Sequence, residues 1–125
     1  MLRKIHTEHA PQAIGPYSQG IEAGNFIFLS GQIPVDPETN EIIEGDIVAQ
    51  TNQVMRNIQA ILASIGLTLN HIVKTTIFLK NMDEFTLVNE AYAKHFGEHR
   101  PARSTVEVSR LPKNVSIEIE VIAAK

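Results

Sequence analysis

Alternating positions predict β-strands at 72–80, 103–108 and 115–124, because an extended chain sends successive side chains to opposite faces. We also expect strands at 2–5, a short edge strand, and at 17–23 and 26–30, which flank a turn. Gly24 and Asn25 predict a tight turn that joins 17–23 and 26–30 into a hairpin. Within 72–80, the alternation predicts that Val73, Thr75 and Ile77 share one face.

Two further segments repeat apolar residues at helical spacing. The first begins after Asp46, whose side chain can cap the helix, and runs to about Ile65, with Gly66 as its stop. The second follows Asp83, a candidate N-cap, and ends near Phe96. The pattern therefore predicts two amphipathic helices, each with one face directed to a core.

The order of these elements predicts an α+β protein, with a mixed β-sheet covered on one face by two α-helices. Its 125 residues fit a single domain, 1–125. Two helices leave the other sheet face uncovered, and Phe26, Phe28 and Phe78 are expected there. Because an exposed apolar face of that size is typical of an interface, we expect the chain to form oligomers through it.

Composition narrows the possible function classes. The chain is 43% hydrophobic and 20% charged, which fits a folded globular protein. Its formal net charge of −3 and the absence of any lysine or arginine run disfavour nucleic-acid binding. Having no cysteine, it can use neither disulfides nor thiol nucleophiles. No segment is long and apolar enough for a membrane span or a signal peptide, so we expect a cytoplasmic protein with no membrane partner.

Residues 100–108 carry the most informative charge pattern. Arg103 follows Pro101 at the start of a strand, where a guanidinium is suited to bidentate binding of a carboxylate. The closing strand carries Glu118 and Glu120 on a single face. These charges form either a structural ion-pair ladder or a small polar site for an anionic substrate, with a carboxylate that moves protons. The residue pattern leaves both interpretations open.

Other candidate residues are less specific. Tyr17 at a strand start is either a core residue with a hydrogen-bonded hydroxyl or a phenol donor that faces a ligand. Ser30 stands beside Gly31, which frees the backbone, but no nucleophile elbow surrounds it, so a serine hydrolase is not expected. The histidines form no set of three ligands, and we expect no metal site. No phosphate-binding or dinucleotide motif is present.

Seven short runs together resemble the Rid family of reactive intermediate deaminases, and within it the RidA subfamily. The runs are AIGPYSQ at 13–19, SGQIP at 30–34, VKTT at 73–76, VN at 88–89, PARS at 101–104, LPK at 111–113 and IEIE at 117–120. The resemblance extends collinearly from about residue 5 to 124, and it is the combination of runs that is specific. It implies a chorismate-mutase-like fold and a homotrimer with clefts between subunits, which agrees with the open sheet face.

The resemblance also implies an activity: cofactor-free hydrolysis of 2-iminopropanoate and 2-iminobutanoate to 2-oxoacids and ammonia. By position in the motifs, Arg103 would hold the substrate carboxylate and Glu120 would activate the attacking water, assisted by Tyr17. Four more residues would contact the substrate. They are Ser30, Gly31, Asn89 and Thr105.

Thr105 departs from the family pattern, because many members have cysteine there. Thiol-dependent behaviour is therefore not expected of this chain, whereas imine hydrolysis needs no thiol. Two alternative functions stay open. One is a non-catalytic trimer that binds or senses small carboxylates in the same cleft, and the other is the ribonuclease or translation-inhibitor activity ascribed to some members. The acidic charge balance counts against the second alternative.

Overall fold

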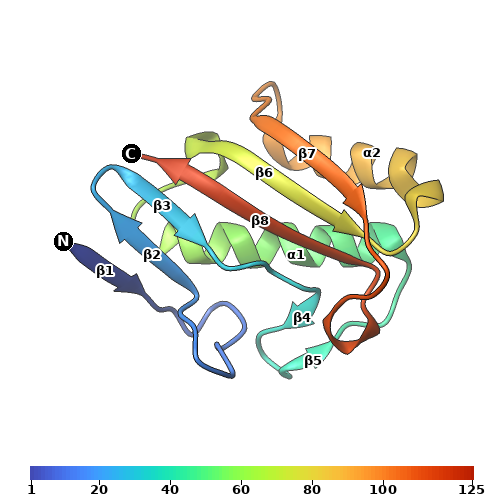
Figure 1. The fold of residues 1–125 in the computed structure, drawn as a ribbon, viewed down its shortest axis with the longest axis horizontal. Coiled ribbons are helices and arrows are strands. Elements are labelled where there is room, and N and C mark those ends of the chain that lie inside the picture. Colours follow the sequence, from blue (N-terminus) through green and yellow to red (C-terminus); the bar gives the residue numbers. More distant parts are fainter.

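A six-stranded sheet with two helices on one face makes up the body of the molecule (Figure 1). The computed structural model describes residues 1–125. In spatial order the strands are β1 (Leu2–Ile5), β2 (Gly20–Ala23), β3 (Phe26–Leu29), β8 (Ile117–Ala124), β6 (Ile72–Leu79) and β7 (Ala102–Glu107). Only β6 and β7 run parallel; all other neighbours are antiparallel. The sheet is therefore mixed, as predicted.

Both helices, α1 (Ile47–Ala63) and α2 (Phe85–Phe96), lie behind the sheet in Figure 1. Apolar side chains of β3, β6 and β8 meet the apolar stripes of these helices in one buried core. Burial of these apolar side chains removes them from water and supplies most of the driving force for folding. The predicted fold class is confirmed: two helices cover one face of a mixed sheet.

The short elements lie at the ends of the sheet. β4 (Val35–Asp36) and β5 (Glu41–Ile42) form a separate antiparallel ribbon. Three single turns of 3-10 helix complete the chain. They are η1 (Leu69–His71), η2 (Met82–Glu84) and η3 (Pro112–Asn114).

The helix ends confirm one predicted cap and correct the other. Asp46 accepts a hydrogen bond from the Ala49 amide at 2.9 Å, as an N-cap does. Asp83 does not cap α2, because the chain first makes the turn η2, whose cap is Asn81. A three-residue turn thus separates the capping side chain from the long helix.

Val73 corrects the predicted face of β6. Register shifts by one residue between Ile72 and Lys74, so Val73 forms a bulge and is exposed. Ile72 is buried in its place, and the regular alternation resumes with Thr75. A bulge of this kind inserts one residue into the alternation, and the apolar pattern alone does not reveal it.

The order of the last strands excludes the ion-pair ladder. The ion-pair ladder requires residues 103–108 and 115–124 to be neighbours, but β6 lies between β7 and β8. Arg103 pairs with Thr75, which is buried on the helix-covered face, so Arg103 projects to that side. Glu120 pairs with Thr76, on the opposite face. The predicted arginine and carboxylate are therefore separated by the sheet itself.

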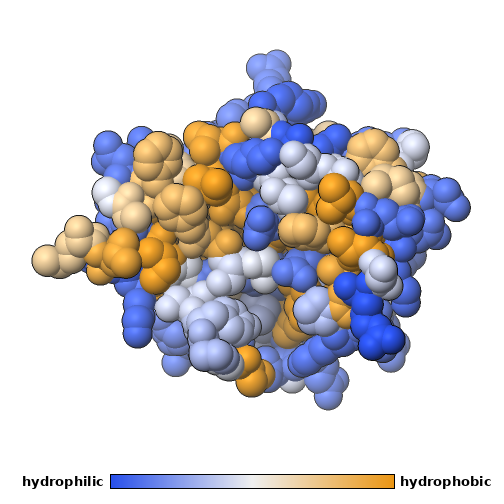
Figure 2. All heavy atoms as spheres, viewed as in Figure 1, coloured by the Kyte–Doolittle hydropathy of each residue, from blue (hydrophilic) through white to orange (hydrophobic).

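The sheet face turned toward the viewer is partly apolar. Figure 2 shows apolar side chains gathered over β1–β3, with polar residues around the outline. Phe26 and Phe28 are 50% and 46% exposed there, and Phe78 is half-buried. No helix has the length and apolar character needed to cross a membrane.

Candidate active site

Arg103 is held by residues of α2 on the helix-covered side of the edge strand β7. One guanidinium nitrogen, Nη1, donates to Asn89 Oδ1 at 2.8 Å. The guanidinium carbon lies 5.4 Å from the ring centroid of Phe85 and 5.2 Å from that of Tyr92. The side chain nevertheless remains exposed. Arg103 is thus a fixed cation whose other N–H groups are free to bind an anion.

The Arg103 side chain lines a shallow depression at the sheet edge. Asn89, Tyr92, Arg100 and Pro101 line the same depression. Arg100 bends back on the chain, and its Nη1 donates to the carbonyls of Gly97 and His99. Two cations at one depression favour an anionic ligand.

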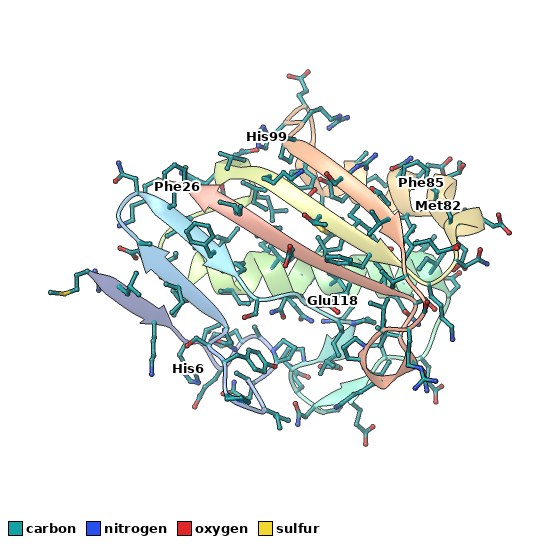
Figure 3. All side chains as sticks on the ribbon, in the orientation of Figure 1. His6, Phe26, Met82, Phe85, His99 and Glu118 are labelled. Carbon is teal, nitrogen blue, oxygen red and sulfur yellow. The ribbon has the colours of Figure 1, made fainter.

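A larger cleft, of about 500 Å³, lies on the other side of the sheet. Its wall comprises the loop that contains Tyr17, the segment that follows β3, the turn η3 and the first residues of β8. It brings together three of the predicted site residues: Tyr17, Ser30 and Gly31. The carboxylate in this cleft is that of Glu118, whose place on β8 is labelled in Figure 3.

Gly31 makes room for the Glu118 side chain. Gln32 pairs with Ile119 through two backbone hydrogen bonds, of 2.8 and 3.1 Å, and this pairing sets Gly31 against β8. A Cβ atom at Gly31 would collide with Glu118 Oε2 and stand 2.9 Å from Cδ. The carboxylate therefore occupies the volume that any other residue at position 31 would fill.

Local hydrogen bonds also order the residues around Glu118. Ser30 Oγ donates to the Ser18 carbonyl at 2.6 Å, so this hydroxyl braces the cleft wall. The Tyr17 amide donates to the Gly15 carbonyl at 2.9 Å, in a tight turn where Gly15 has φ of 131°. Tyr17 itself is 54% exposed. Its phenol is thereby available to a ligand.

The local environment raises the pKa of Glu118. Burial of the carboxylate is the main cause, and the nearby charge of Glu120 adds to it. No cation forms an ion pair with Glu118 that would offset these effects. A half-buried carboxyl group of raised pKa is better suited than an exposed one to accept a proton and return it.

Glu120 does not lie in the Glu118 cleft. It is exposed on the open face, in a smaller hollow that it shares with Phe28, Lys74 and Thr76. Glu118 and Glu120 share one strand face, and alternation alone gives no reason to prefer either. The pairing of Gln32 with Ile119 is the signal that places Glu118 beside Gly31, and it is not visible in the sequence pattern.

Thr105 lies on the same side of β7 as Arg103, since both pair with inward-facing residues of β6. Its Oγ1 atom is buried and has no hydrogen-bond partner. Such an unpaired hydroxyl costs stability unless a ligand or another chain satisfies it.

The predicted site residues therefore form two groups on opposite faces of the sheet. Arg103, Asn89 and Thr105 belong to the helix-covered side of β7. Tyr17, Ser30 and Gly31 belong to the cleft on the other side. One copy of the chain does not bring the two groups to a single ligand.

A stability measurement tests the environment of Glu118 without reference to function. Because the folded-state pKa is raised above the ordinary value of 4.5, the stabilising contribution of the protonated form is complete below the unfolded-state pKa. It is lost as pH rises through the folded-state pKa. We therefore expect Glu118→Gln to raise the thermal midpoint at pH 7, and this advantage to shrink below about pH 4.

Thermal unfolding followed by circular dichroism across pH 3.5–8 measures this difference. Glu44→Gln is the matched control, because Glu44 is exposed in a loop, and it should leave the midpoint nearly unchanged at every pH. A Glu118→Gln protein that is less stable than wild type at pH 7 would contradict the account.

Comparison with known proteins finds relatives that match nearly the whole chain. Residues 7–125 match the family described as endoribonuclease L-PSP. A RutC family protein of Pyrococcus horikoshii is 59% identical over 125 residues, covering 100% of this chain and 99% of that protein. The 2-iminobutanoate/2-iminopropanoate deaminase of Escherichia coli K12 is 52% identical over 128 residues, covering 100% and 99%.

Solved structures agree with these sequence relationships. A protein of unknown function from the conserved Rid protein family, from Yersinia pestis, superposes with a TM-score of 0.97 at 51% identity, and each chain is covered to 100%. E. coli TdcF with bound serine superposes with a TM-score of 0.94 at 44% identity, with 98% of each chain covered.

Proposed function

Since this chain belongs to the endoribonuclease L-PSP family, which includes the Rid proteins, we propose that it hydrolyses small 2-imino acids to 2-oxoacids and ammonia. The observation that carries the proposal is Glu118, a half-buried carboxylate of raised pKa in a cleft beside Tyr17. The full-length similarity to the E. coli deaminase supports the reaction class. The substrates proposed are 2-iminopropanoate and 2-iminobutanoate.

The proposal includes a site shared by two copies of the chain. Arg103 and Glu118 lie on opposite faces of the sheet, so they meet at one substrate only if a second copy supplies one of them. The exposed phenylalanines of the open face offer a surface for that contact. We propose a homotrimer in which each cleft joins the Glu118 side of one copy to the Arg103 side of the next. Such a trimer brings Arg103 and Glu118 to one substrate and also covers the exposed phenylalanines.

Arg103 would bind the substrate carboxylate. Its free N–H groups are suited to a two-point hydrogen bond with a carboxylate, and Asn89 already fixes the guanidinium. The Thr105 hydroxyl, buried and unpaired beside Arg103, would donate a further hydrogen bond to the bound acid. The serine bound to E. coli TdcF is also a small molecule that carries a carboxylate, and it supports this ligand class.

Glu118 would manage the proton transfers. As water adds to the imine carbon, the Glu118 carboxylate takes a proton from the water, the C=N π electrons move to nitrogen, and Glu118 passes the proton to that nitrogen to give the neutral carbinolamine. Glu118 then takes the proton of the carbinolamine hydroxyl as the C=O bond forms, and it returns this proton to nitrogen as the C–N bond breaks and ammonia leaves. Tyr17 would donate from its phenol to the reacting atoms. Holding the acid and the water together supplies much of the rate by proximity.

This proposal moves one role relative to the sequence-based prediction. Glu118 takes the water-activating role predicted for Glu120, because Glu118 shares its cleft with Tyr17, Ser30 and Gly31. Glu120 remains an exposed residue of the open face. Ser30 would act mainly through the wall that its hydroxyl braces.

A coupled assay tests the function. An amino-acid oxidase or dehydratase generates the imine, semicarbazide traps what remains, and 2-oxoacid formation is followed with and without the protein. Faster 2-oxoacid formation supports the proposal. Saturable 2-oxoacid binding with unchanged imine decay would instead identify a carboxylate-binding protein. Sedimentation velocity on the same sample measures whether the protein is a trimer.

A further inference from the structure

Arg103 lies against two aromatic rings that no step of the proposed reaction uses. Its guanidinium carbon is within 5.5 Å of both ring centroids, those of Phe85 and Tyr92. Phe85, Asn89 and Tyr92 follow one another at i, i+4 and i+7, so they form one stripe of α2. Figure 3 shows Phe85 on α2, beyond β7 at the edge of the sheet.

The sheet fixes the position of Tyr92 through a hydrogen bond. Its hydroxyl shares a 2.7 Å hydrogen bond with Thr75 Oγ1, and Tyr92 and Thr75 are 5% and 0% exposed. Thr75 is the strand neighbour that pairs with Arg103. The hydrogen bond therefore joins α2 to the sheet at the level of the arginine, and burial raises the pKa of Tyr92 so that its hydroxyl stays protonated.

The orientation of the Tyr92 ring is limited on a second side. The ring centroid of Phe96 is 4.8 Å away, in a tilted arrangement. Arg103 lies over the Tyr92 ring, with its guanidinium carbon 5.2 Å from the centroid. Phe85 is only half-buried, but it packs against the core from the first turn of the same helix. Both aromatic surfaces exist before any ligand binds.

We propose that Phe85 and Tyr92 are positioning residues that hold the Arg103 guanidinium in the orientation that receives the substrate carboxylate. This inference rests on the proposed function for its kinetic consequence. The rings attract the cation through their negative faces and leave its N–H edges uncovered. Asn89 fixes one of those edges, so the remaining donors point in one direction.

The physical need for this arrangement follows from the arginine side chain. A free arginine on an edge strand samples many rotamers, and ordering it on binding weakens affinity. A guanidinium that is already ordered avoids that loss. The rings act on binding of the carboxylate alone, and the proton transfers at Glu118 lie on another element. Loss of the rings should therefore raise KM more than it lowers kcat.

Two substitutions remove one ring each while keeping an apolar side chain: Phe85→Leu and Tyr92→Leu. Tyr92→Phe keeps the ring and loses only the hydroxyl. Leu87→Ala is the matched control, since Leu87 is a 48% exposed apolar residue of the same helix and lies outside the stripe of Phe85, Asn89 and Tyr92. If Tyr92→Leu fails to fold, Phe85→Leu, which alters a half-buried side chain, still decides the question.

The first measurement needs no substrate. In the ligand-free protein, the Arg103 side-chain Nε–Hε signal, assigned by its absence in Arg103→Lys, should be shifted by the two ring currents and should show restricted motion in ¹⁵N relaxation. Phe85→Leu and Tyr92→Leu should each move this signal toward the free-arginine position and increase its mobility. Tyr92→Phe and Leu87→Ala should retain it.

The second measurement is steady-state imine hydrolysis. Each leucine variant at 85 or 92 should raise KM about 3- to 30-fold, with kcat within about threefold of wild type. Unchanged Arg103 signals in both leucine variants, or equal losses in kcat with KM unchanged, would overturn the inference. If the wild-type protein does not accelerate imine decay, the proposed function fails, and the nuclear magnetic resonance measurement still decides whether the rings hold Arg103.

Discussion

Glu118→Gln should lower kcat for imine hydrolysis by at least about 100-fold, whereas Glu120→Gln should leave kcat within about threefold of wild type. A glutamine amide cannot accept the proton of the attacking water. Glu118 lies in the cleft with Tyr17, Ser30 and Gly31. Glu120 lies in a separate hollow of the open face, so its loss affects the reaction only through its charge.

The two variants form a matched pair, because they make the same chemical change on the same face of β8, two residues apart. The coupled imine assay gives kcat for each, and sedimentation velocity checks that each keeps the oligomeric state of the wild type. The opposite ranking, with Glu120→Gln inactive and Glu118→Gln active, would return the water-activating role to Glu120.

Arg103→Ala should lower kcat/KM by about 100- to 1,000-fold. Charge-assisted hydrogen bonds are worth about 1.5–3 kcal/mol each, and the variant loses two of them together with the orientation of the substrate. Arg103→Lys should recover only part of this loss, because an ammonium cannot make the two parallel hydrogen bonds of a guanidinium.

Arg56→Ala is the control for Arg103→Ala, since Arg56 is an exposed arginine of α1, outside both groups of site residues. Its kcat/KM should match that of wild type. Isothermal titration with the 2-oxoacid product separates binding from chemistry, and the Arg103 variants should lose the binding signal. An Arg103→Ala protein with wild-type kcat/KM would show that the carboxylate is held elsewhere.

Sequence patterns are sufficient to predict the fold class, the open apolar sheet face and the position of Arg103. The stripe after Asp46 predicted α1 because helical spacing is a local property. The exposure of the phenylalanines is predictable because two helices can cover only one face of the sheet, which leaves the other face open. The sequence predicts Arg103 as a site residue because an arginine soon after a proline at a strand start is a local signal, and the structure places Arg103 in a polar depression.

What sequence patterns could not supply was strand order. The insertion of β6 between β7 and β8 sends Arg103 and Glu120 to opposite sides, and this depends on a parallel pairing between distant segments. The choice between Glu118 and Glu120 depends on the bridge between Gln32 and Ile119, which is again non-local. The bulge at Val73 could not be predicted for the same reason, since only the register between β6 and β8 reveals it.

The central claim is that each working cleft joins Glu118 of one copy to Arg103 of another. Mixing Arg103→Ala with Glu118→Gln tests it most directly, because each variant alone has no complete cleft. Native mass spectrometry of isotope-labelled protein reports whether subunits exchange. Once exchange is complete, a 1:1 mixture should recover about a quarter of wild-type activity, since one cleft in four then receives both intact residues. Exchanged hybrids that stay as inactive as the separate variants would contradict the shared cleft.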